Sequence, residues 1–294
     1  MIVPPVSETP SALTDWVEAS GAFTEADGYV ARAEILTILE QSGQEDPEQL
    51  ESVIRRHAEL RRRYGGDAYP FEITPGGYRM RGAWAGHLPY SFMLLVSLNQ
   101  HYPQLRFRRG TASRVAVLFE LLSQHAVRCY CSGHTVRLGA PRRTPAPASF
   151  PAAVDYLAQE LLEERGGSQV TTGDEKDDGL DIVGWIPFLD RRPGQVVILA
   201  QCAIGVDWNG KLPELSEELW RDHISWHVVP IRAFIVPFHH DEGVGWRRSS
   251  REGGIVFDRL RVTSCLGTTQ FEQEFSEDVR RWCRQRIKRL PRYR

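Results

Sequence analysis

Residues 180–203 read LDIVGWIPFLDRRPGQVVILAQCA, and the fold class follows from the pattern of this stretch. Two runs rich in β-branched and aromatic residues, 180–185 and 196–203, flank a tight Arg-Pro-Gly turn. Such runs are typical of strands, and their nearly continuous apolar character indicates a buried sheet. We therefore expect a hairpin that holds Asp181 and Gln201 side by side at the end of two central strands.

Helical and strand patterns alternate on both sides of this hairpin. Apolar spacing predicts helices over 88–101, 111–129, 152–165 and 275–290, and further strands over 228–237 and 254–263. This order predicts an α/β (α+β) core over residues 111–294. Residues 1–110 are expected to form a mainly helical N-terminal region, with turns or short strands around 65–86.

The composition of the chain is that of an ordinary globular protein. It has 294 residues, of which 41% are apolar and 25% charged, and the five cysteines are an odd number. No apolar run approaches the roughly 18–20 residues of a membrane helix, and no signal peptide is visible. We expect a cytoplasmic protein with reduced thiols and no membrane partner.

The formal net charge of −2 conceals a strong segregation of charge along the sequence. Residues 1–50 carry −9 and residues 151–278 carry −11, whereas residues 51–150 carry +10 and residues 279–294 carry +8. Basic blocks of this size favour a polyanionic partner such as nucleic acid. The alternative is that the unlike blocks neutralise each other within the fold.

The hairpin also carries residues with metal-binding chemistry. Carboxylates at Asp177 and Asp178 precede the strand that begins near Asp181, and the second strand ends in polar Gln201. Oxygen ligands from neighbouring strands are what Mg²⁺ binds, leaving its other positions to water and phosphate. Lys211, one of only three lysines, follows ten residues after Gln201. In the alternative interpretation these polar residues merely end the strands.

At these residues the sequence resembles the PD-(D/E)XK nuclease superfamily, whose members have the restriction-endonuclease-like fold. Asp181 matches the first acid, and Gln201-Cys202-Ala203 stands at the (D/E/Q)-x-K tripeptide. Alanine at 203 replaces the family lysine, and Lys211 is the candidate for a displaced one. Either Glu160 or Glu120 would supply the acid that the family often places on a preceding helix.

The resemblance implies a central mixed sheet flanked by helices, with an N-terminal helical extension. It also implies a Mg²⁺- or Mn²⁺-dependent nuclease that hydrolyses phosphodiester bonds of DNA, or of RNA. Asp181 and Gln201 would bind the metal, while Lys211 and one of the two glutamates would complete the catalytic site. The implied setting is restriction or defence against phage, with a partner protein or homo-oligomerisation left open.

Two basic segments are candidates for nucleic-acid contact. Arg247, Arg248 and Arg251 follow Trp246 in a segment that we interpret as a loop, suited to phosphate contacts with stacking. The final predicted helix places Arg284 and other basic residues away from its apolar stripe. In both cases a solvated surface, or contact with the acidic block, is the alternative.

Two rival functions follow from the same features. Alanine at 203 favours a catalytically inactive nuclease-fold scaffold that binds nucleic acid or a partner protein. The acidic residues 1–50 would suit an adaptor that docks a basic partner.

Overall fold

A computed structural model of the chain describes residues 1–6, 9–24, 28–42, 47–107, 111–167, 178–240 and 243–292. The chain divides into two compact units. The first comprises Met1–Arg109, Pro237–His239 and Arg259–Arg294, and the second comprises Gly110–Val236 and His240–Asp258.

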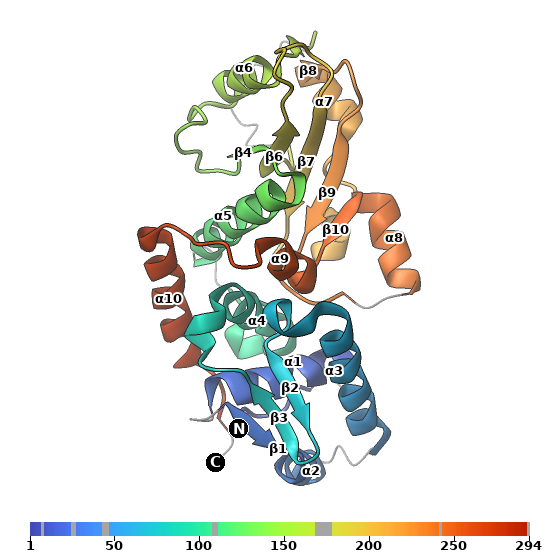
Figure 1. The fold of residues 1–294 in the computed structure, drawn as a ribbon, viewed down its shortest axis with the longest axis vertical. Coiled ribbons are helices and arrows are strands. Elements are labelled where there is room, and N and C mark those ends of the chain that lie inside the picture. Colours follow the sequence, from blue (N-terminus) through green and yellow to red (C-terminus); the bar gives the residue numbers. More distant parts are fainter. Residues whose placement is uncertain are drawn as a thin grey trace. The chain divides into compact units, whose positions relative to one another are not determined.

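The second unit is built on a five-stranded mixed sheet (Figure 1). Its strands, in their order across the sheet, are β10 (Ile255–Phe257), β9 (Ile231–Ile235), β7 (Val196–Cys202), β6 (Ile182–Ile186) and β4 (His134–Arg137). The pairs β4–β6 and β6–β7 are antiparallel, whereas β7–β9 and β9–β10 are parallel. The hairpin expected from the sequence is therefore present, because β6 and β7 pair with Ile182 opposite Ala200.

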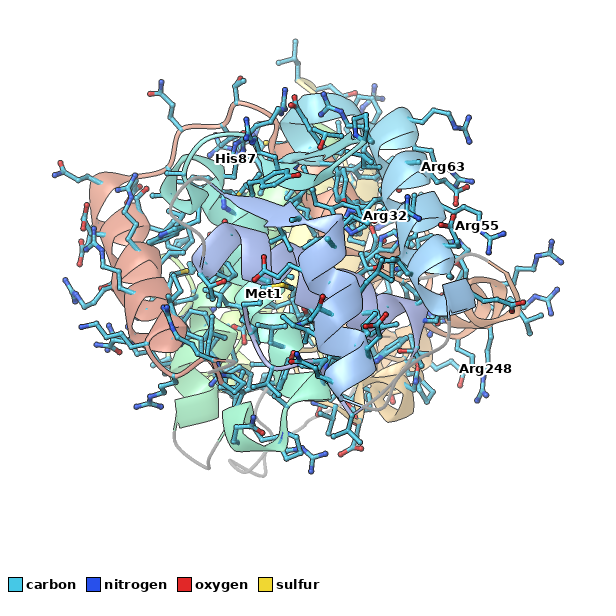
Figure 2. All side chains as sticks on the ribbon, turned by 90° about the horizontal axis from the view of Figure 1, so that it is seen from below. Met1, Arg32, Arg55, Arg63, His87 and Arg248 are labelled. Carbon is cyan, nitrogen blue, oxygen red and sulfur yellow. The ribbon has the colours of Figure 1, made fainter. Side chains whose placement is uncertain are left out.

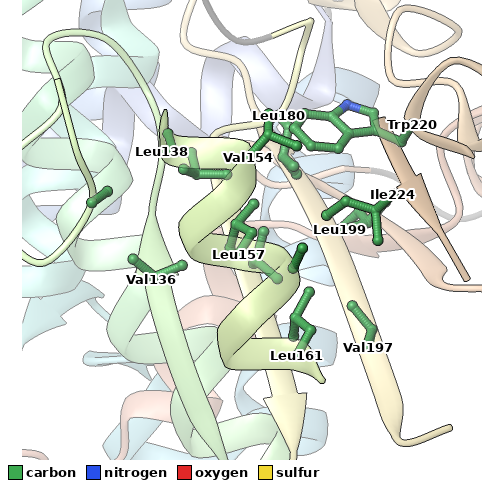
Figure 3. Close-up of a cluster of buried hydrophobic side chains, with 14 of the residues drawn as sticks. Val136, Leu138, Val154, Leu157, Leu161, Leu180, Val197, Leu199, Trp220 and Ile224 are labelled. Carbon is green, nitrogen blue, oxygen red and sulfur yellow. The ribbon is translucent and has the colours of Figure 1, made fainter. Parts of the chain in front are cut away.

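Helices cover both faces of this sheet. Helix α5 (Thr111–Cys131) packs on β4, β6 and β7. Gly184 on β6 permits this approach, since a Cβ there would lie 2.8 Å from Val127 Cγ1. Helix α6 (Phe150–Leu161) covers the opposite face, where Leu157 joins Leu199 of β7 in a buried cluster (Figure 3). Each fully buried leucine of this kind contributes about 1.5–3 kcal/mol of hydrophobic stabilisation.

The crossover between β7 and β9 carries the remaining elements of that face. They are η3 (Trp208–Lys211), α7 (Glu217–His223) and the strand β8 (Ile224–Ser225), which pairs with β5 (Glu164–Arg165). A crossover of this length is what a parallel pair of strands requires, because consecutive parallel strands cannot be joined by a tight turn. Helix α8 (Val244–Gly253) then connects β9 to β10.

The first unit contains helices and a small antiparallel sheet. Its N-terminal elements are α1 (Pro10–Phe23), β1 (Tyr29–Ala31), α2 (Arg32–Gln41), α3 (Pro47–Ala68), β2 (Phe71–Thr74) and β3 (Gly77–Met80), with sheet order β1-β3-β2. They are followed by η1 (Trp84–His87), α4 (Leu88–His101) and η2 (Pro103–Leu105). Two C-terminal helices, α9 (Arg259–Leu266) and α10 (Gln273–Ile287), pack against α4.

The α/β (α+β) class expected from the sequence is confirmed, and three details differ. Residues 259–294 group with the N-terminal region rather than with the α/β core, because α9 and α10 pack on α4. The strand expected over 254–263 is only β10, and α9 follows it at once. Residues 244–253 form helix α8 instead of a loop. In the part of the chain that the structure describes, no helix is long and apolar enough to cross a membrane.

Candidate functional site

Backbone hydrogen bonds to the segments on either side of it hold Asp181 at the start of β6. Its carbonyl oxygen accepts hydrogen bonds from the amides of Leu138 and Gly139, at 2.7 and 3.2 Å. Its own amide donates to the carbonyl oxygen of Ala200 at 3.0 Å. The side chain is held as well, because Oδ2 accepts a hydrogen bond from the backbone amide of Cys202 at 2.7 Å. Asp181 therefore has a defined position where three strands meet.

Glu120 of α5 brings a second carboxylate to the same place. Gly139 locates both groups, since a Cβ on this residue would lie 2.3 Å from Glu120 Oε2 and 3.1 Å from Asp181 Oδ1. Any side chain at 139 would collide with Glu120, so glycine leaves the space in which the two carboxylates converge. The structure thus brings together Asp181 and one of the two glutamates that the sequence left open.

Arg137, at the end of β4, forms a buried ion pair with Glu120. Its Nε donates to Glu120 Oε2 at 2.7 Å, and its Nη1 donates to the carbonyl oxygen of Pro141 at 3.0 Å. The two side chains of the pair are only 6% and 9% exposed. Nη2 of Arg137 is buried and makes no hydrogen bond among the described residues. Arg137 was not a candidate from the sequence, because one arginine among thirty-three gives no signal.

Gln201 is buried on β7 and belongs to a second group of polar side chains. Its Nε2 donates to Glu214 Oε2 at 2.9 Å, and Lys211 Nζ lies 4.0 Å from the same oxygen. Gln201 Oε1 is buried without a hydrogen-bond partner in the described part of the chain. Gln201 stands next to Asp181 in the strand register, but it directs its amide nitrogen to the loop after β7. Glu214, which joins Gln201 to Lys211, was missed because acidic residues are frequent in that segment.

The negative charges of Asp181 and Glu120 affect the ionisation of the neighbouring Cys202 thiol. Burial raises the pKa of this thiol well above the usual value, and the negative charges of Asp181 and Glu120 raise it further. Arg137 acts in the opposite direction but does not reverse the shift. The thiol is therefore protonated at neutral pH and is not a nucleophile. This part of the site stays negative in character, as a cation-binding site should.

The oxygen atoms at this place are of the chemical type that binds Mg²⁺. Glu120 and Asp181 offer carboxylate oxygens, and Gln201 Oε1 is an amide oxygen without a partner, so all three are the hard ligands that this ion prefers. Mg²⁺ is commonly held by one or two carboxylates, with water and phosphate completing its shell. Within the described ranges, no group of three or more His, Cys, Asp or Glu residues could hold a metal ion. Any site here therefore depends on the two carboxylates, with Gln201 as the neighbour of Asp181 in the strand register.

The other sequence candidates lie apart from these two carboxylates. Glu160 is exposed on α6 and has no hydrogen bond to Asp181 in the described structure; burial raises the pKa of Tyr156, and the charge of Glu160 raises it further. Asp177 lies outside the described residues. Asp178 has a φ of 46° and accepts, at Oδ2, a 2.8 Å contact from His223 Nε2. This dyad anchors α7 to the start of β6 and was not expected.

The basic candidates are exposed, and their setting differs from the expectation. Arg247, Arg248 and Arg251 lie on helix α8, and Arg248 pairs with Glu252 at 2.8 Å. Their spacing places them on the solvent side, because Ser249 and Gly253 face the interior. The sequence pattern missed this helix since it offers almost no apolar stripe. Arg284 is exposed on α10, which belongs to the first unit.

Comparisons with protein-family models, with curated proteins and with solved structures give no match for this chain. Its function is therefore argued from the site itself.

Proposed function

We propose that the chain is a metal-dependent nuclease of the restriction-endonuclease-like fold, which hydrolyses phosphodiester bonds of DNA. The observation that carries the proposal is the convergence of Glu120 and Asp181 at Gly139. These carboxylates come from the helix before the sheet and from the start of its second strand, as the family resemblance implies. The order α5, β4, β6, β7, β9, with three antiparallel strands followed by a parallel one, supports the same fold.

The roles in this proposal follow from the contacts. Glu120, Asp181 and Gln201 Oε1 would hold Mg²⁺ or Mn²⁺, which when bound polarises the scissile phosphate and makes a nearby water more acidic. The backbone amide of Cys202 and the pair with Arg137 orient the two carboxylates. Glu214 holds the Gln201 amide and stands beside Lys211, whose ammonium would attract the phosphate. Restriction or defence against phage, beside a partner protein, is the proposed setting.

A second candidate function rests on the ion pair between Arg137 and Glu120. The guanidinium already neutralises one of the two carboxylates, and no lysine stands at position 203. A nuclease fold that keeps its acids for structure would have this arrangement, and it would then bind nucleic acid or a protein partner without cutting. The two candidates differ in whether the charge of Glu120 is available to a cation.

A cleavage assay separates them. Supercoiled plasmid, linear DNA and RNA are incubated with the protein in Mg²⁺, Mn²⁺ or EDTA. We expect cutting in the divalent metals only, and a loss of about 100-fold or more in Asp181→Asn, which corresponds to roughly 2.7 kcal/mol of transition-state stabilisation. Asparagine keeps the acceptor for the Cys202 amide, so the variant should stay folded.

Glu120→Gln and Glu160→Gln form a matched pair in the same assay. Glu120→Gln should abolish cutting, whereas Glu160→Gln should cut like the wild type because Glu160 is exposed on α6. Absence of cutting by the wild type on every substrate, with DNA binding retained, would favour the inactive scaffold. Cutting that survives in Asp181→Asn would reject the assignment of the site.

A further inference from the structure

Helix α3 of the first unit presents a row of arginines to solvent. Arg55, Ala58 and Arg62 are exposed and lie on one stripe, at positions i, i+3 and i+7. The two arginines are two turns apart, about 10.5 Å along the helix axis. Neither of them forms an ion pair with any residue in the described ranges. Figure 2 shows Arg55 and Arg63 projecting outward from this helix.

Two acidic residues of α3, Glu51 and Glu59, lie near Arg55 and Arg62 in the sequence and are paired with other arginines. Glu51 lies 2.7 Å from Arg32 of α2, and Glu59 is paired with Arg63. Each of these acids is therefore balanced by a partner other than Arg55 and Arg62. The stripe keeps a net positive charge, with the small side chain of Ala58 between its two arginines.

The other face of α3 is packed and fixes the direction of the stripe. Val53, His57 and Leu60 are buried, and the His57 ring lies 4.7 Å from the ring of Tyr78 in the hairpin β2–β3. Burial lowers the pKa of His57 to about 3, so it is neutral and adds no charge. The helix cannot rotate its arginines inward without exposing this apolar face.

The hairpin β2–β3 stands beside the helix and completes a concave surface. A hollow of about 300 Å³ lies here, lined by Ile54 of α3, by Thr74 and Pro75 of the hairpin and by Arg32 of α2. The tip itself, Pro75 and Gly76, is exposed. The surface thus has a basic helix and an exposed turn with a hollow between them. Such an uneven surface is better suited to the grooves of a nucleic-acid duplex than to a flat partner.

We propose that α3 and the hairpin β2–β3 form a docking surface for duplex DNA. An α-helix with side chains is about 10–12 Å across, and the major groove of B-form DNA is about 12 Å wide. With α3 in the groove, Arg55 and Arg62 reach phosphates or base edges, and a strand of the backbone runs over the hollow toward Thr74. This surface is independent of the carboxylate site, so the proposal stands whether or not the second unit cuts DNA.

The major groove gives the proposal its selectivity. In double-stranded RNA the major groove is deep and narrow, and a helix cannot enter it. The surface should therefore prefer duplex DNA to duplex RNA of the same sequence. An acidic protein or a single-stranded nucleic acid would bind this surface through its positive charge alone. Binding of such a partner would not depend on the spacing of Arg55 and Arg62.

The test is an equilibrium binding measurement on the full chain in EDTA, where no cutting occurs. The probe is a fluorescent DNA duplex of about 20 base pairs, roughly two helical turns. Arg55→Gln/Arg62→Gln is compared with Arg128→Gln/Arg221→Gln, which removes two exposed arginines from the second unit. We expect the α3 variant to bind at least about 10-fold more weakly and to lower the salt slope by about 2, and the control variant to bind like the wild type.

Three results would overturn the proposal. One is unchanged affinity and salt slope in the α3 variant, and another is an equal loss in both double variants. The third is equal affinity for duplex DNA, duplex RNA and polyglutamate, which would identify a general anion surface. Thermal unfolding of both variants should match the wild type, since all four side chains are exposed. Because binding is measured in EDTA, where the proposed metal site does not act, a failure of the nuclease proposal stays distinguishable from a failure here.

Discussion

Each unit of the protein buries an arginine beside two carboxylates, and the two arginines are satisfied to different degrees. In the first unit Arg259 is 1% exposed. Its Nη1 donates to Asp15 and Glu18 at 2.9 and 3.2 Å, its Nη2 donates to Asp15 and Ser97, and its Nε donates to the carbonyl oxygen of Pro237. Every nitrogen of this guanidinium has a partner.

Arg137 in the second unit is less completely paired. It holds one carboxylate, that of Glu120, and its Nη2 has no partner in the described chain. Asp181 lies beside Glu120 but is held by the Cys202 amide, and the neighbouring Gln201 Oε1 is also unpartnered. Unpartnered buried polar atoms occur in both units, and what distinguishes this group is that two carboxylates converge beside it.

The difference separates a structural network from a candidate site. A closed network such as that of Arg259 rigidifies the packing of α1, α4 and α9, and it leaves nothing for a ligand. The incomplete one around Arg137 retains oxygen and nitrogen atoms that a cation, water or phosphate could satisfy. The contrast predicts that the loss of each arginine has a different effect on the free energy of unfolding.

Arg259→Met should destabilise the protein most. It would leave the buried carboxylates of Asp15 and Glu18 without their cation, and breaking a buried pair in this way costs about 3–5 kcal/mol. Urea unfolding measures the change in the free energy of unfolding. Arg261→Met, an exposed arginine on the same helix, is the control and should change it by less than about 0.5 kcal/mol. Equal losses in the two variants would show that the network adds nothing specific.

Glu18 should make the stability of the first unit depend on pH. Burial raises the pKa of Glu18 to about 7, although Arg259 acts against this shift. A folded-state pKa above the unfolded value of 4.5 means that the native protein binds the proton more tightly. The stabilisation is thus complete below about pH 4.5 and is lost as the pH rises through about 7, a change of about 3 kcal/mol.

Glu18→Gln should remove this slope. The free energy of unfolding is measured from pH 5 to pH 8 in the wild type, in Glu18→Gln and in Glu34→Gln, an exposed glutamate on α2. Glu34→Gln should retain the wild-type profile. A wild-type protein that becomes more stable between pH 5 and 7, with Glu18→Gln following it, would reject the assignment.

Arg137→Met should cost less than Arg259→Met. The substitution removes the cation of one buried carboxylate, Glu120, and the hydrogen bond to the Pro141 carbonyl oxygen, so it should cost about 3 kcal/mol, the lower end of the range for a broken buried pair. If the two carboxylates accept a cation, Mg²⁺ at ten times its dissociation constant should return about 1.4 kcal/mol to this variant. Thermal unfolding with and without Mg²⁺ measures the effect.

The double variant Arg137→Met/Asp181→Asn is the control for that experiment. It retains Glu120 but lacks the second carboxylate, so Mg²⁺ should leave its unfolding temperature unchanged. An identical response in both variants would mean that the ion acts elsewhere on the chain. If Mg²⁺ does not stabilise Arg137→Met, then Glu120 and Asp181 do not bind the ion. Their role would then be structural, like that of Asp15 and Glu18 beside Arg259.

The elements with strong periodic patterns could be predicted from the sequence. Helix α4 has the predicted bounds, Leu88–His101. The strands β6 and β7 lie within or near the predicted runs. Helix α8 could not be predicted, because its sequence VGWRRSSREG has charges where an amphipathic helix would have apolar residues. The helix is flanked by glycines, Gly243 before it and Gly254 after it, and it buries Ser249 and Gly253.

The candidate site was predictable only in part. Asp181 and Gln201 follow from strand ends that any hairpin brings together. The choice between Glu120 and Glu160 depended on which helix packs with its glutamate toward the start of β6, and local spacing does not contain that information. Arg137 and Glu214 became visible only through their contacts with Glu120 and Gln201.

The strongly periodic helices, the β6–β7 hairpin and the segregation of charge could be read from the sequence, because these depend on the order of residues along the chain. The tertiary structure alone decided that residues 259–294 join the N-terminal unit and that Arg259 meets Asp15. It also decided that Glu120 meets Asp181 at a glycine. Such contacts join residues far apart in the chain, and they arise from the packing of whole faces rather than from any local preference.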